Sequence, residues 1–228
     1  MNTIGKLYTL TSFGESHGEA LGGVIDGCPA GFPLSVDEIQ YELDRRRPGQ
    51  SSVTTSRTEE DRVEILSGVF EGVTTGSPIG FIVRNKDQRS RDYDEIKDLF
   101  RPSHADYTMQ AKYGIRDYRG GGRSSAREHV VRVVGGAVAR QVLKRLGIFI
   151  HGYTSQVGPI VLNKTYHELN LEETDANVVR CPDSVIAREM ELFIRKVQEE
   201  HDSVGGVVSC VIRGVPVGVG EPVFDRFQ

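Results

Sequence analysis

The feature that most constrains this chain is a glycine triplet that runs directly into a helical pattern. Residues 118–128 read Tyr-Arg-Gly-Gly-Gly-Arg-Ser-Ser-Ala-Arg-Glu, and helical spacing of apolar residues predicts a helix from about Ser124 to Leu146. Glycine permits positive φ and close approach of a ligand, and a helix start offers free N–H groups to an anion. The segment therefore predicts an anion-binding loop, with a flexible loop closed by a capping serine as the plain alternative.

Side chains around the triplet favour a phosphorylated ligand over that alternative. Arg119, Arg123 and Arg127 supply fixed positive charge. The hydroxyls of Ser124 and Ser125 can cap the helix or hydrogen-bond a phosphate oxygen. Together they predict a site for a small phosphorylated molecule.

A second arginine run, Arg45-Arg46-Arg47, ends a helix that is predicted over 35–47 and begins with the capping-box pattern Ser-Val-Asp-Glu. Cations at the end of a helix interact favourably with its dipole, which gives these arginines a purely structural reading. Three adjacent side chains point in three directions, however, and only some can serve the dipole. Both interpretations of this arginine run, ligand binding and a structural role, therefore remain open.

Length and charge narrow the classes of partner. The 228 residues suffice for one large domain or two small ones. The formal net charge is -4, so no overall basic field points to nucleic acid or to an anionic membrane surface. Local arginine clusters in a mildly acidic chain fit a small anionic ligand better than a polymer.

Cysteine usage and the N-terminus predict a cytoplasmic protein. The three cysteines are far apart and form no CxxC pair, which argues against a disulfide framework or a zinc site. The first residues lack the charged-then-apolar pattern of a signal peptide, and no apolar run is long enough to span a bilayer. Histidine spacing typical of metal sites is also lacking, so we expect no metal.

The coarse pattern of elements predicts an α+β fold, because strands and helices come in clusters rather than in strict alternation. Polar loops are expected at 50–61 and 85–98. The predicted helices cover 35–47, 106–113, 124–146 and 182–201, and the predicted strands cover 6–12, 21–26, 63–73, 79–83, 149–157 and 207–213. The strands at 63–73 and 79–83 are expected to form a hairpin. Gly135-Gly136 within the long helix predicts close packing against another helix or a flat ligand.

The segment Gly14–Gly18 matches the G-x-S-x-G nucleophile elbow and raises the alternative of a serine hydrolase that uses Ser16. Such an elbow needs a strand before the serine and a helix after it. A strand is predicted on both sides, and the histidines at 151, 167 and 201 have no convincing aspartate partner. The hydrolase is therefore the weaker hypothesis.

Two histidines in turns are better candidates for proton transfer. His17 lies between glycines beside Glu15, and His104 follows Pro102-Ser103 near Asp106. Histidine titrates near neutral pH and is the commonest proton-transfer residue. A surface or hydrogen-bonded structural role is the alternative for each, and it is the reading kept for His129 and the remaining histidines.

Several longer blocks, taken in order along the chain, resemble chorismate synthases. They lie at residues 14–18, 23–27, 44–49, 66–72, 100–107 and 117–128. The resemblance implies conversion of 5-enolpyruvylshikimate 3-phosphate to chorismate and phosphate, a trans-1,4 elimination in the shikimate pathway that requires reduced FMN. It also implies a helical core between two antiparallel sheets and assembly as a homotetramer.

The resemblance also implies roles for individual residues. His17 corresponds to a histidine that protonates the reduced flavin, and His104 to one that assists departure of phosphate. Arg123, Ser124 and Ser125 correspond to an FMN-binding segment.

Further arginines complete the expected site. Arg46 corresponds to a position that binds NADPH in members that reduce their own flavin. We expect Arg47, Arg101 and Arg127 to bind the anionic substrate. Ser52 stands where the family usually has a basic residue, which weakens the expectation for NADPH.

Members of this family continue well past residue 228. We therefore expect residues 1–228 to be a single, truncated domain that lacks part of the flavin site. Weak turnover, or an inactive remnant, is expected of this form alone.

Overall fold

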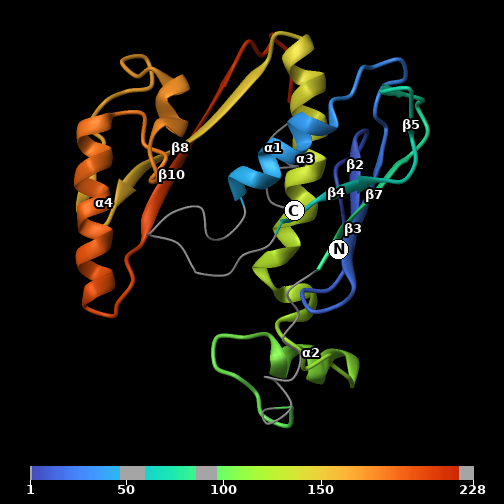
Figure 1. The fold of residues 1–228 in the computed structure, drawn as a ribbon, viewed down its shortest axis with the longest axis horizontal. Helices are drawn as coiled ribbons and strands as arrows, with labels where there is room; N and C mark the ends of the chain where they lie inside the picture. Colours follow the sequence, from blue (N-terminus) through green and yellow to red (C-terminus); the bar gives the residue numbers. More distant parts are fainter. Residues whose placement is uncertain (1, 47–59, 86–96, 221–228) are drawn as a thin grey trace. The chain divides into compact units, whose positions relative to one another are not determined.

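The computed structural model of the chain describes residues 2–46, 60–85 and 97–220 (Figure 1). The predicted loops at 50–61 and 85–98 lie largely outside these ranges. The described residues up to 142 form one compact unit, and residues 143–220 form a second. Both units combine helices with antiparallel strands, which confirms the predicted α+β class.

The first unit contains an antiparallel sheet of five strands. In spatial order these are β1 (Thr3–Ile4), β2 (Thr9–Gly14), β3 (Ala20–Asp26), β7 (Ile79–Arg84) and β4 (Val63–Ile65). Alternate residues of β7 are buried, as expected for a strand with one face on the core. Leu10 pairs with Ile25, and Ile25 with Ile79, which aligns the buried face across three strands.

The predicted hairpin of 63–73 with 79–83 is only partly right. β4 does pair with β7, but the chain between them forms a separate two-stranded ribbon of β5 (Val69–Phe70) and β6 (Val73–Thr74). Gly68 and Gly72 have positive φ on either side of β5. These turns divide what the apolar pattern suggested was one strand.

Helix α1 (Val36–Arg46) begins as its capping box predicts, since the Glu38 N–H donates to Ser35 Oγ at 3.2 Å. Helix α2 (Asp106–Tyr113) also has the predicted bounds. The long helix α3 (His129–Arg145) starts later than predicted. Two 3-10 turns, η2 (Gly122–Ser124) and η3 (Ala126–Glu128), replace its expected first turn.

The apolar face of α3 packs directly on the five-stranded sheet. Val130, Val131, Val134 and Val138 are fully buried within the same core cluster as the sheet residues. A Cβ added to Gly135 would lie 2.8 Å from Leu10 Cδ2 of β2. The close packing predicted for this glycine is therefore made against a strand, and not against another helix or a flat ligand.

The second unit has a three-stranded antiparallel sheet and its own core. Its strands, in spatial order, are β10 (Gly206–Arg213), β8 (Phe149–Val157) and β9 (Ile160–Val161). A 3-10 turn, η4 (Leu171–Ala176), precedes helix α4 (Ser184–Glu199). Asp183 caps α4 by accepting two backbone N–H groups, and Met190 is fully buried in the core.

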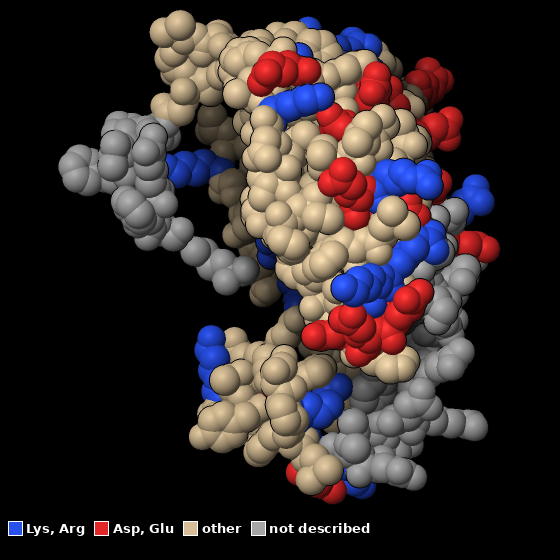
Figure 2. All heavy atoms as spheres, turned by 90° about the vertical axis from the view of Figure 1, so that its left-hand side faces the viewer, with Lys and Arg blue, Asp and Glu red and all other residues tan. Residues whose placement is uncertain are grey.

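Figure 2 shows acidic and basic side chains interspersed on one face of the protein. A surface on which both signs of charge alternate is typical of a solvated face. None of the helices in the described ranges is both long and apolar enough to cross a membrane.

Candidate active site

Two turns of the first unit meet where the sequence predicts a site. The turn Gly14–Gly18 connects β2 to β3, and the N–H of Ser16 donates to the carbonyl of Gly122 at 3.4 Å. Gly120 has a φ of +67°, and a Cβ added to it would lie 2.0 Å from His17 Nδ1. The glycine triplet thus does permit close approach, and at Gly120 the approaching group is the His17 ring.

His17 is largely buried in this contact, at 8% exposure. Its Nδ1 lies 3.0 Å from Ser16 Oγ. Ser16 itself is only 2% exposed, and the chain continues into strand β3 rather than a helix. The nucleophile elbow is therefore not formed, because an elbow presents an accessible serine between a strand and a helix.

Arg123 connects the glycine loop to β2. Its guanidinium donates to Gly14 O at 3.2 Å, to Ser12 Oγ at 2.8 Å and to Asn2 Oδ1 at 3.1 Å. Glu128 Oε1 lies 3.9 Å away. Arg123 is thus a positively charged group whose orientation is fixed by the protein.

The two serines that follow differ in their surroundings. Ser125 Oγ accepts the N–H of Arg127 at 3.3 Å and so caps η3, while Ser124 is exposed. A Cβ added to Gly122 would meet no atom within 4 Å. The exposed hydroxyl of Ser124 and the guanidinium of Arg123 are donors of the kind that suit a phosphate.

A buried ion-pair network lies beside these turns. Asp61 Oδ2 accepts from Arg46 Nη1 at 2.9 Å, and Asp61 Oδ1 accepts from Arg127 Nη2 at 2.8 Å. Arg127 Nε donates to Asn85 Oδ1 at 2.6 Å. The sequence singled out the two arginines but neither Asp61 nor Asn85, since no motif or spacing distinguishes those positions.

A second network fixes the segment that carries His104. Arg101 donates to both carboxylate oxygens of Asp106, at 2.8 and 2.9 Å, and to the carbonyl of Gly120 at 2.7 Å. Arg116 Nη1 lies 3.6 Å from Asp106 Oδ1. Arg101 therefore connects the turn before α2 to the glycine that packs on His17.

His104 is exposed at this turn, directly after Ser103, which has a φ of +59°. Its backbone N–H donates to Arg101 O at 3.3 Å, and its Nδ1 lies 2.9 Å from Pro102 O. A carbonyl only accepts, so Nδ1 carries the proton and Nε2 is left for other partners.

The Arg101 guanidinium lowers the pKa of Asp106 well below its usual range. The ionised Asp106 carboxylate therefore stabilises the fold fully above about pH 4. This stabilisation is lost as pH falls further, because Asp106 takes up a proton at a higher pH in the unfolded chain than in the folded one. We expect Asp106→Asn to lower the free energy of unfolding by about 2 kcal/mol at pH 7. That difference from wild type should shrink steadily below about pH 4 in urea titrations. A difference that stays constant with pH would contradict this assignment.

Arg119 and Arg47 complete the predicted set. Arg119 binds Asp117 through Nε and Nη2, at 2.9 and 2.8 Å, and this pairing lowers the pKa of Asp117. Arg47 lies outside the described residues.

No group of three or more potential metal-ligating side chains occurs within the described ranges.

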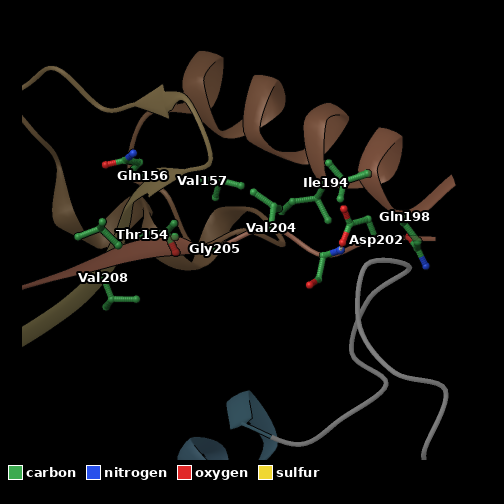
Figure 3. Close-up of a pocket in the computed structure, with 13 residues that line it drawn as sticks. Thr154, Gln156, Val157, Ile194, Gln198, Asp202, Val204, Gly205 and Val208 are labelled. Atoms are coloured by element: carbon green, nitrogen blue, oxygen red, sulfur yellow. Dashed lines mark hydrogen bonds between the residues drawn. The ribbon is translucent and has the colours of Figure 1, made fainter. Parts of the chain in front are cut away.

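A cavity of about 610 Å³ lies in the second unit, between α4 and the strands β8 and β10 (Figure 3). Apolar side chains such as Val157, Ile194 and Val204 share its lining with Gln156, Gln198 and Asp202. It contains none of the predicted site residues. The predicted site residues that the structure describes all lie in the first unit.

Comparison with known proteins agrees with these observations. The family described as chorismate synthase matches residues 8–228. A chorismate synthase of Phocaeicola vulgatus is 61% identical over 227 residues, which cover 100% of this chain and 63% of that protein. One of Parabacteroides distasonis is 60% identical and is covered to 64%. The chain thus spans slightly less than two thirds of the length of these relatives.

A solved structure leads to the same family. The crystal structure of a chorismate synthase aligns with a TM-score of 0.76 at 32% identity, covering 97% of this chain and 63% of that one. The match over nearly the whole chain, together with the residues brought together above, shows that this chain belongs to the chorismate synthase family.

Proposed function

We propose that this chain carries a large part of the active site of a lyase that converts 5-enolpyruvylshikimate 3-phosphate to chorismate and phosphate by trans-1,4 elimination. The observation that carries the proposal is the meeting of the His17 turn with the glycine triplet, beside the fixed guanidiniums of Arg101 and Arg123, in a chain of this family. Fixed positive charge stabilises a phosphate as it departs, without reorganisation during the reaction.

Arg123, Ser124 and Ser125 are the residues that would hold FMN. The open side of Gly122, the exposed hydroxyl of Ser124 and the guanidinium of Arg123 suit the flavin's phosphate. When bound, reduced FMN supplies electron density to the substrate as the phosphate leaves. Arg46 is proposed to bind NADPH, if the enzyme reduces its own flavin.

His104 is proposed as the proton donor to the departing phosphate. Its Nδ1–H is engaged by Pro102 O, so the protonated ring would offer Nε2–H to a phosphate oxygen. Arg101 holds the same turn in place and, with Arg47 and Arg127, is proposed to bind the substrate's phosphate and carboxylates.

His17 is proposed to hold a proton beside the cofactor. Burial against Gly120 and the contact with Ser16 Oγ fix the plane of the ring, and an imidazole held in one orientation suits proton transfer near neutral pH. We further propose a homotetramer that works in the cytoplasm, as the family resemblance implies.

Anaerobic phosphate release tests this function. The assay supplies 5-enolpyruvylshikimate 3-phosphate and reduced FMN to residues 1–228 joined to the remaining segment of the Phocaeicola vulgatus relative. Phosphate and chorismate formed in equal amounts, and only with reduced flavin, would support the proposal. Absence of release from a folded chimera, while the relative itself is active, would refute it. Residues 1–228 alone should release phosphate weakly or not at all.

A further inference from the structure

Asp61 is a buried carboxylate to which the proposed chemistry assigns no step. Its side chain is fully buried in both of its ion pairs, and its backbone adopts a φ of +44°. Non-glycine residues adopt this left-handed conformation only occasionally. A buried carboxylate is costly unless it is paired and hydrogen-bonded, so the arrangement around Asp61 needs a reason.

The two oxygens of Asp61 bind arginines from different parts of the chain. Oδ2 accepts from Arg46, at the end of α1, and Oδ1 accepts from Arg127, in η3. One carboxylate therefore fixes the separation of two guanidiniums. These arginines are the ones proposed above for the nicotinamide cofactor and for the substrate.

The hydrogen bonds continue from Arg127 to the turn that carries His17. Arg127 Nε donates to Asn85 Oδ1, and Asn85 Nδ2 donates to the carbonyls of Glu15 and Gly18 at 3.0 and 2.8 Å. These two carbonyls bracket His17 in the sequence. A continuous series of hydrogen bonds thus leads from α1 to His17.

We propose that Asp61 is a positioning residue that holds Arg46 and Arg127 and, through Asn85, the His17 turn in one array. The proposal deepens the proposed function, because the anions that the arginines receive are its substrate and cofactor. The negative charge of Asp61 neutralises one of the two positive charges of Arg46 and Arg127, and this weakens the attraction of the pair for an anionic ligand. Its contribution is therefore geometric.

A first test needs no ligand. In Asp61→Asn, an amide donor faces Arg46 or Arg127 in place of a carboxylate oxygen. Loss of the hydrogen bond from Arg127 Nη2 to Asp61 should loosen the guanidinium, so we expect the Nε–H of Arg127, which donates to Asn85, to exchange with water about ten-fold faster. The amide signals of Gly14–Gly18 should also shift in ¹H–¹⁵N spectra. A folded Asp61→Asn protein in which neither quantity changes would overturn the proposal.

Two further variants make this test decisive. Glu64→Gln removes an exposed ion pair with Arg84, three residues from Asp61 along the chain, and should leave both signals unchanged. If Asp61→Asn does not fold, Arg46→Gln takes its place, since Arg46 lies at the end of a helix and is partly exposed. Arg46→Gln should shift the Arg127 and Gly14–Gly18 signals. Unchanged signals there would overturn the coupling.

Ligand affinity separates geometry from charge. Asp61→Asn removes a negative charge, so a purely electrostatic role predicts tighter binding of 5-enolpyruvylshikimate 3-phosphate by the chimera described above. A positioning role predicts binding about ten-fold weaker, with a larger effect on KM than on kcat. Tighter binding would overturn the proposal. Failure of wild type to bind would count against the proposed function, and the ligand-free spectra would still decide the role of Asp61.

Discussion

Replacing His104 with alanine is expected to lower the rate of phosphate release by about 10²–10⁴-fold, the usual contribution of a general acid. The side chain is exposed, and its one described side-chain hydrogen bond is to the carbonyl of Pro102 two residues away. Stability should therefore change by less than about 0.5 kcal/mol, as for most surface substitutions. The rate is measured in the anaerobic assay of the chimera, and stability by urea unfolding.

His129→Ala is the matched control for this variant. His129 is also exposed, and its Nδ1 lies 2.9 Å from the carbonyl of Ala126, so the same kind of contact is lost. It should retain wild-type turnover. If His104→Ala kept full activity, or if its stability fell along with its activity, His104 would be a structural residue and not the proton donor.

Elements defined by local signals could be predicted from the sequence. The capping box at Ser35 correctly places the start of α1, and α2 has the predicted bounds because Gly114, with a φ of +76°, ends it. The start of α3 was wrong for a tertiary reason. Arg123 donates to β2 and Ser125 caps a separate short turn, so residues that look helical in sequence form 3-10 turns instead.

The site was predicted only in part, because its charges are paired over long sequence distances. The arginines stand out in the sequence, since they cluster beside glycines. Their partners do not: Asp61 lies 66 residues from Arg127, and Asn85 lies 42 residues from it. Periodicity and spacing carry no information about such pairs. Whether an arginine pairs with a carboxylate of the protein can therefore be seen only in the folded structure.

The contact between Gly120 and His17 gives the second large expected effect. Alanine at Gly120 must adopt a φ of +67° and place its Cβ 2.0 Å from His17 Nδ1. The backbone conformation costs about 1 kcal/mol and the overlap about 1–3 kcal/mol more. We expect Gly120→Ala to lower the free energy of unfolding by about 3 kcal/mol, to shift the His17 ring signals and to abolish phosphate release.

Gly114→Ala isolates the backbone contribution. Gly114 has a φ of +76°, but a Cβ there would meet no atom within 4 Å, so this variant should lose only about 1 kcal/mol and keep its activity. Equal losses in the two variants would show that no steric contact with His17 exists. Adding His17→Ala to Gly120→Ala should recover the steric part of the loss, because the overlap requires both the added Cβ and the imidazole ring. Activity should stay absent in the double variant, because the imidazole proposed to hold the proton is gone. Recovered stability without recovered activity would show that Gly120 makes room for the ring and that the ring itself is needed for phosphate release.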